Sequence, residues 1–254
     1  MGSDSVTPTT PVTTVLWDID GTLLHAGGVA AHAFLDAVAE VTGTRPAPER
    51  RDYGGRLDTE IADMLLTAVG AAATLIDDVL EVLARLVDER LGELRAQTIA
   101  CPGVEALVGK LAQAGVRQTV VTGNLASIAR HKLEAAGLVP PIEPEFGGYG
   151  DSAPTRAAVA QVALDRLSAA GWRPHLDGVW IVGDTARDLA CARAVGVRCA
   201  VVATGRRPAG ELDCLEADIM LPDLSDPRPL LDLWQLLPST LTGRPGRLPD
   251  GRGW

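Results

Sequence analysis

The sequence has 254 residues, of which 46% are hydrophobic, 22% are charged and only 4% are aromatic. This composition is typical of a folded globular chain whose core is filled mainly by aliphatic side chains. The formal net charge of -10 argues against a nucleic-acid partner, because binding to a phosphate backbone requires a basic surface. A small anionic substrate fits, since a metal ion and arginine can reverse the field locally.

Targeting and membrane signals are weak. Residues Met1 to Thr14 are polar and lack the apolar run of a signal peptide. The longest apolar stretch, Ile61 to Ile76, contains Asp63 and Gly70 and is too short to cross a membrane. We therefore expect a cytoplasmic protein without a membrane partner. The four cysteines show no metal-ligand or disulfide pattern and are expected to be small buried thiols: Cys101, Cys191, Cys199 and Cys214.

Strand-like and helix-like segments alternate along most of the chain. The first apolar run, residues 13–17, stops abruptly at Asp18, which is typical of a buried strand that leads into a loop. We expect further strands, the last one weaker, at Arg117–Thr122, Val179–Gly183, Val197–Ala203 and Asp218–Leu221. Helical patterns lie between them at Val104–Ala114, Ser127–Ala136, Thr155–Ala170 and Leu189–Val195. This order predicts an α/β fold, a Rossmann-like parallel sheet flanked by helices.

Residues 25–100 show a different pattern, in which no strand is convincing. Helical spacing is seen over Ala30–Val41, Asp58–Val69 and Leu75–Leu94. We predict that 25–100 form an all-helical cap domain, inserted into a discontinuous α/β core made of residues 1–24 and 101–254. The turn at Cys101-Pro102-Gly103 marks the return to the core. Residues 242–254, rich in Gly, Pro and Arg, are expected to form a loose tail.

Acidic residues follow two of the predicted strands. Asp18 and Asp20 lie on the same side of the chain where the first strand ends, and Asp184 and Asp188 follow the strand at 179–183. Two like charges about 4 Å apart repel by about 4 kcal/mol at an effective dielectric of about 20, so the cluster requires a cation. Oxygen ligands without Cys or His favour Mg²⁺.

Groups suited to phosphate lie at a third strand end. Thr122-Gly123-Asn124 offers a hydroxyl and free backbone N–H groups that match a phosphoryl oxygen. Arg156, at the start of a predicted helix, is a candidate for the fixed positive charge, because guanidinium matches phosphate oxygens in a fork.

Together these segments resemble the haloacid dehalogenase superfamily, in the phosphatase branch with a helical cap after the first strand. Asp18-Ile19-Asp20-Gly21-Thr22-Leu23 is similar to its first motif, Thr122-Gly123-Asn124 to its second, and Gly183-Asp184-Thr185 with Asp188 to its fourth. The resemblance covers roughly 15–203. The third motif departs from the pattern: the family usually has a lysine there, whereas this chain offers Arg156, with Lys132 as the alternative.

The resemblance implies a nucleophilic Asp18 and an acid–base Asp20. It also implies that Mg²⁺ is held by Asp18, Asp184 and the Asp20 carbonyl, and that Asp188 orients the metal site. Thr122 and Arg156 would bind the phosphoryl group. The alternative for Asp188 is a merely structural acid at a helix start. The remaining candidates for substrate binding are Gly21, Thr22, Gly123 and Asn124 in the core, and His25, Arg56 and Thr59 in or near a glycine-rich cap loop. That loop loosely resembles the substrate loop of phosphoglycolate phosphatases.

The expected substrate is a small phosphorylated metabolite, and the expected state is a monomer or homodimer. Two alternatives stay open: a sugar phosphomutase of the same fold, and a catalytically silent binding or regulatory protein. Asp20 argues against a dehalogenase, which needs no general acid at that position. Residues 25–100 contain no lysine for the Schiff base that a phosphonate-cleaving relative requires.

Overall fold

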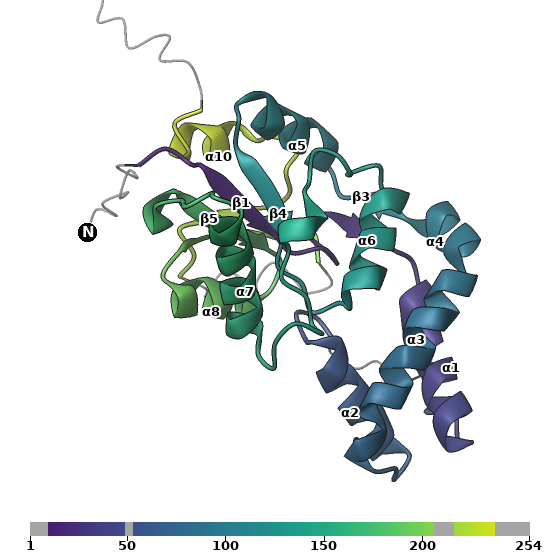
Figure 1. Ribbon diagram of the computed structural model, residues 1–254. Coiled ribbons are helices and arrows are strands. Elements are labelled where there is room, and N and C mark those ends of the chain that lie inside the picture. Colours follow the sequence, from purple (N-terminus) through teal and green to yellow (C-terminus); the bar gives the residue numbers. More distant parts are fainter. Residues whose placement is uncertain (1–9, 49–52, 206–215, 237–254) are drawn as a thin grey trace, which may run out of the picture.

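The computed structural model describes residues 10–48, 53–205 and 216–236. The predicted tail at 242–254 and Cys214 lie outside these ranges. A five-stranded sheet forms the centre of the molecule, in the order β4-β1-β5-β6-β7 (Figure 1). All neighbouring strands are parallel, as predicted. The strands are β1 Thr14–Trp17, β4 Arg117–Val120, β5 Val179–Gly183, β6 Arg198–Val202 and β7 Ile219–Leu221.

Helices cover both faces of the sheet, because consecutive side chains of a strand point to opposite faces. In β1, Val15 and Trp17 pack into one core, and Leu16 packs into another. The first core receives α5 (Val104–Gln113), α6 (Ala126–Ala135) and α10 (Arg228–Leu233). The second receives α7 (Arg156–Ala169) and α8 (Ala186–Val195). Both faces of β1 are buried, which explains why the consecutive residues Val15, Leu16 and Trp17 are all hydrophobic.

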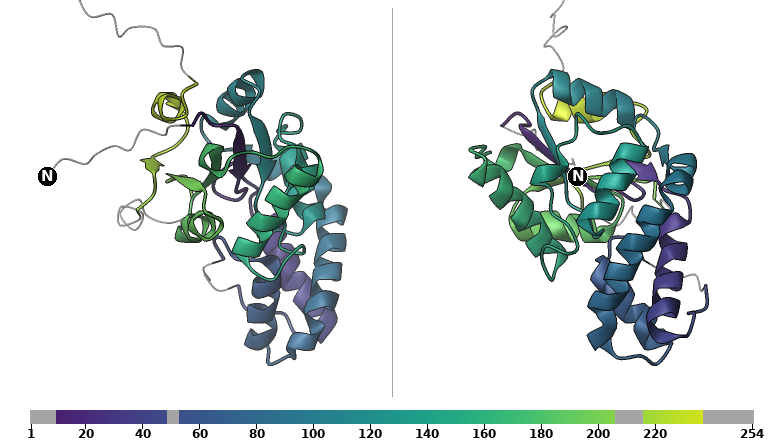
Figure 2. Two further views of the ribbon diagram at one scale, coloured as in Figure 1. Left: turned by 60° about the vertical axis from the view of Figure 1, so that its left-hand side comes forward. Right: turned by 45° about the vertical axis from the view of Figure 1, so that its right-hand side comes forward.

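The cap segment, residues 25–100, is largely helical and lies beside the sheet (Figures 1 and 2). Buried aliphatic residues of α1 and α3, such as Val38 and Leu83, form its interior. The predicted helical stretch that ends at Leu94 is interrupted at Arg90, which separates α3 from α4. The elements are α1 Val29–Thr42, α2 Asp58–Ala68, the 3-10 turn Ala73–Leu75, α3 Ile76–Glu89 and α4 Leu91–Gln97.

The expectation that the cap segment contains no strand is wrong. Leu24–His25 forms β2 and Ile99–Ala100 forms β3, and the two strands pair antiparallel, with Leu24 opposite Ala100. Two residues are too few to show an alternating pattern, so these strands leave no signal in the sequence. The division into core and cap stays a prediction, and the β2–β3 pair lies at both of its boundaries.

Other differences are small. Helix α8 begins at Ala186, three residues before the predicted start, because its first turn is polar and shows no apolar period. Helix α10 was not predicted, since its six residues are too short for a helical period to emerge. Cys101, Cys191 and Cys199 are buried free thiols, as expected. Within the described ranges, no helix has both the length and the apolar character needed to cross a bilayer.

Candidate active site

Parallel pairing brings the predicted site residues to one edge of the sheet. Trp17 in β1 is opposite Val120 in β4 and Val182 in β5. The three chain segments that follow these positions therefore leave the sheet side by side, at the same edge. They include Asp18 and the two motifs at 122–124 and 183–188, so the edge expected from the sequence is the one that forms.

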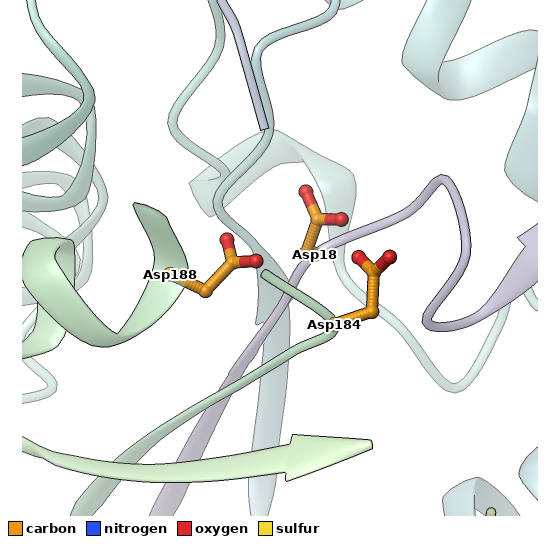
Figure 3. A group of neighbouring side chains, drawn as sticks. All are labelled: Asp18, Asp184 and Asp188. Carbon is orange, nitrogen blue, oxygen red and sulfur yellow. The ribbon is translucent and has the colours of Figure 1, made fainter. Parts of the chain in front are cut away.

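Three carboxylates converge at this edge. Asp18 follows β1, Asp184 follows β5 and Asp188 lies in the first turn of α8, and Figure 3 shows the three groups turned toward one another. One oxygen of each lies within 4.8 Å of the others, and all three residues are buried. With Mg–O bonds of about 2.1 Å, one ion spans about 4.2 Å between opposite ligands, so small side-chain movements suffice to share it. The donor set fits Mg²⁺.

The carboxylates of the cluster lie in surroundings that disfavour their ionised forms. Burial, together with the nearby charge of Asp188, raises the pKa of Asp18 to about 7, although Arg156 opposes this shift. Burial and then the charge of Asp18 raise the pKa of Asp184 to about 8. Burial is the larger cause of both shifts and the neighbouring carboxylates add to it, so the ionised forms of Asp18 and Asp184 are unfavourable here. A bound divalent cation would lower both pKa values, because it stabilises the ionised form.

Arg156 is the cation that contacts the cluster directly. Its Nη2 donates to Asp18 Oδ1 at 2.6 Å and to Asp188 Oδ1 at 2.5 Å. Burial opposes its charge, but Asp188 and Asp18 raise the pKa of Arg156, so it stays protonated. Its Nε is buried and has no hydrogen-bond partner among the described residues. Arg156 therefore pairs with two carboxylates of the cluster, and its assignment to the third motif stays a prediction.

Gly21 leaves space for the Asp184 side chain, and Thr22 donates a hydrogen bond to it. Gly21 has a φ of 89°, a region that favours glycine, and a Cβ there would lie 2.6 Å from Asp184 Oδ2. Thr22 is buried and donates to Asp184 Oδ1 at 3.3 Å. Both residues, predicted to bind substrate, contact the carboxylate cluster instead of an open surface. Their contribution to substrate binding stays a prediction.

Asp188 has two structural partners. Thr185 is the N-cap of α8, and its backbone N–H and its hydroxyl both donate to Asp188 Oδ2, at 3.0 and 2.6 Å. This capping box satisfies the helix terminus. The other oxygen of Asp188 accepts from Arg156. Asp188 is thus an acid at a helix start and a member of the cluster at once.

The second motif lies beneath the cap loop 53–57. A Cβ at Gly123 would overlap the backbone carbonyl of Arg56, so only glycine allows this approach. Thr122 is buried, and its hydroxyl accepts from the backbone N–H of Asn124 at 3.3 Å. Arg56 and Thr59 are half-buried in this loop and at the start of α2. His25, by contrast, is exposed in β2, on the strand pair that links cap and core.

Two further side chains reach the site. Lys132 of α6 is buried, and its Nζ donates to Asp20 Oδ2 and, at 2.9 Å, to Asn124 Oδ1. Lys132 and Arg156 thus lie at different aspartates rather than competing for one position. Asp58 of α2 is also buried and accepts the Leu125 N–H at 2.8 Å. Sequence analysis did not single out Asp58, since an acid in the first turn of a helix is ordinary.

Known proteins are similar to this chain over most of its length. The model of the haloacid dehalogenase-like hydrolase family matches residues 15–193. A phosphoglycolate phosphatase of Rhodospirillum rubrum is 32% identical over 216 residues, covering 79% of this chain and 84% of the relative. A plasmid-encoded phosphoglycolate phosphatase of Cupriavidus necator is 28% identical and covers 94% and 96%. The chain belongs to the haloacid dehalogenase-like hydrolase family. Within that family, it groups with the phosphatases.

Solved structures share the fold. CbbY from Rhodobacter sphaeroides, in complex with phosphate, aligns with a TM-score of 0.67 and 20% identity, covering 85% of this chain and 96% of that chain. A hydrolase from Pseudomonas syringae aligns with a TM-score of 0.64 and 20% identity, covering 87% and 98%. These likenesses extend over nearly the whole length of each neighbour.

Proposed function

We propose that this chain hydrolyses the phosphate ester of a small metabolite through an aspartyl-phosphate intermediate on Asp18, with Mg²⁺ as its cofactor. The observation that carries the proposal is the convergence of three buried carboxylates and Arg156 at the ends of β1 and β5. The family match and the phosphatase relatives support it.

The metal site would consist of Asp18, Asp184 and the backbone carbonyl of Asp20, with Asp188 orienting the cluster. When bound, Mg²⁺ would neutralise part of the charge on the phosphoryl oxygens. The raised pKa values of Asp18 and Asp184 support this assignment, because such groups have more to gain from a cation than exposed acids do.

The chemistry then follows from the side chains. Asp18 attacks phosphorus, the bond from phosphorus to the leaving oxygen breaks, and Asp20 gives that oxygen its proton. In the second half, Asp20 takes a proton from water as the water oxygen attacks phosphorus, which releases phosphate and regenerates Asp18. Thr122 and the guanidinium of Arg156 would hold phosphoryl oxygens throughout.

The cap segment would exclude water from this centre, since its loop 53–57 lies directly on Gly123. Arg56, Thr59 and His25 are the proposed contacts to the leaving group. Phosphoglycolate is the first substrate to test, because relatives at 28% to 32% identity carry that name. We further propose a cytoplasmic monomer or homodimer, which suits an acidic chain that acts on a small metabolite.

The test is phosphate release from a panel of phosphorylated metabolites, with Mg²⁺ and with a chelator. We expect turnover that requires Mg²⁺, no turnover for Asp18→Asn, and a phosphoryl adduct in the intact mass of Asp20→Asn, whose second step is slowed. Retained turnover in Asp18→Asn would remove Asp18 as the nucleophile. No turnover by the unaltered protein across the panel would favour a binding protein.

A further inference from the structure

A row of four polar side chains connects the cap segment to Asp20. It begins at Asp58, the first residue of α2, which is buried in the cap–core interface. Asp58 Oδ2 accepts the N–H of Leu125 at 2.8 Å, and Asp58 Oδ1 accepts from Asn124 Nδ2 at 3.5 Å. Asn124 Oδ1 in turn accepts from Lys132, which donates to Asp20. Of the bonded pairs in this row, only Asn124 and Lys132, which are 8 residues apart, are close in the chain.

The ends of the row determine the orientation of Asn124. An ionised carboxylate only accepts hydrogen bonds, and an ammonium group only donates them. The amide of Asn124 must therefore turn its NH₂ toward Asp58 and its oxygen toward Lys132. In the reversed amide, the Asn124 oxygen would face the Asp58 carboxylate, and its NH₂ would face the Lys132 ammonium. Asp58 and Lys132 thus require the same orientation of Asn124, with its oxygen turned toward the lysine.

Lys132 is the fixed end of its pair with Asp20. Its side chain is only 3% exposed, whereas the Asp20 side chain is 47% exposed. The buried Lys132 ammonium has few alternative positions, whereas the exposed Asp20 carboxylate has many. Lys132 therefore fixes the position of Asp20. The choice of lysine is also notable because the chain has only one other, Lys110, and otherwise relies on arginine. A compact ammonium can donate to two partners in a space too small for a guanidinium.

The row is complete only when the cap loop is docked on the core. The backbone N–H of Asp58 donates to the carbonyl of Gly123 at 2.8 Å, and Gly123 lies directly against the Arg56 carbonyl. Moving α2 away from the β4–α6 loop would remove Asp58 from Asn124 and Leu125 together. Lys132 and Asp20 belong to the core side of this contact and would stay behind.

We propose that Asp58 and Lys132 are positioning residues, through which docking of the cap loop places Asp20 for proton transfer to the leaving oxygen. The inference rests on the proposed function, since it presumes that Asp20 is the general acid. Lys132 holds the Asp20 carboxyl, Asn124 holds Lys132, and Asp58 fixes Asn124 only when the loop 53–57 lies on the core. Proton donation is thereby coupled to the closed arrangement.

The test compares two substrates that differ in their need for a proton. Para-nitrophenyl phosphate has a good leaving group, whereas phosphoglycolate releases an alkoxide that must be protonated. For Lys132→Met and Asp58→Asn, we expect kcat/KM for phosphoglycolate to fall by about 10- to 100-fold. This is at or below the lower end of the roughly 10²- to 10⁴-fold that general acid catalysis contributes, because Asp20 itself is still present in both variants. The value for para-nitrophenyl phosphate should change less than about threefold. Asp58→Asn preserves the side-chain volume while presenting an NH₂ group to Asn124.

Two controls separate positioning from structure. Arg187 Nε donates to the carbonyl of Gly54 at 3.3 Å, a cap–core contact outside the row, so Arg187→Gln should affect both substrates equally. In the Asp20→Asn background, Lys132→Met should add no further discrimination between the substrates. Equal losses on both substrates in Lys132→Met and Asp58→Asn would overturn the inference and leave the proposed function intact. An unaltered protein that turns over neither substrate would instead contradict the proposed function.

Discussion

At the residue scale, Asp58 shows how burial determines the behaviour of an acid. It is 2% exposed, and this burial raises its pKa from 3.8 to about 6, although Lys132 and the Leu125 N–H act in the opposite direction. A raised pKa means that the folded state binds a proton more tightly than the unfolded state does. The stabilisation from this proton is therefore present in full below about pH 4 and is lost as pH rises through 6.

Replacing Asp58 should remove this dependence on pH. Relative to Asp58→Asn, we expect the unaltered protein to lose about 3 kcal/mol of its free energy of unfolding between about pH 4 and pH 7, from roughly two pKa units at 1.36 kcal/mol each. Urea unfolding of both proteins at several pH values measures the difference, in which the other titrating groups cancel. A difference that stays constant with pH would show that Asp58 titrates normally.

At the scale of elements, two helices begin in the same way but in different surroundings. Thr185 caps α8 while also donating to Asp188, and it is 3% exposed. Thr155 caps α7 by accepting the N–H of Ala158 at 3.2 Å, and it is exposed. A cap alone contributes about 1 kcal/mol. Only at Thr185 does the cap residue also satisfy a buried carboxylate.

The two threonines therefore form a matched pair. We expect Thr155→Ala to lower the free energy of unfolding by about 1 kcal/mol, and Thr185→Ala to lower it by at least twice as much, because Asp188 then loses a buried donor. Chemical unfolding of both variants without metal measures the difference. Equal losses would indicate that the hydroxyl of Thr185 serves the helix end and contributes nothing to Asp188.

Elements with a long hydrophobic or helical pattern could be predicted from the sequence, and elements of two residues could not. Strand β1 and helix α2 were located to within a residue, because a continuous apolar run and a full helical period leave a clear signal. Strands β2 and β3 were missed, since two residues cannot show alternation. The strand-end motifs of the site were predictable because parallel topology alone brings Asp18 and Asp184 together. The Asp58–Lys132 connection depends on how the cap segment packs, which no local pattern encodes.

At the scale of the whole molecule, the carboxylate cluster connects stability to metal binding. Asp18 and Asp184 have pKa values raised to about 7 and about 8, so without metal their protonated forms favour folding. That stabilisation is lost as pH rises through this range. A divalent cation must displace these protons at low pH, but meets ionised ligands at high pH.

Magnesium should accordingly protect the fold in a pH-dependent way. We expect the Tm of the metal-free protein to fall between about pH 6 and pH 8.5, and saturating Mg²⁺ to remove most of that fall. The apparent Kd for Mg²⁺, from Tm measured against its concentration, should be at least about tenfold weaker at pH 6. Asp184→Asn should reduce both effects. If Mg²⁺ raised the Tm equally at about pH 6 and at about pH 8.5, the coupling between metal binding and protonation would be contradicted.

The antiparallel pairing of Leu24 with Ala100 has a consequence for how such a protein can change. These two residues belong to a two-stranded sheet of their own, separate from the central sheet. Residues 26–98 therefore begin and end at adjacent points and form a closed excursion. A segment of another length or shape can be exchanged at these two points without altering strand order or register. Under the proposed function, recognition of the ester in the excursion and the chemistry at phosphorus at the sheet edge can therefore diverge separately.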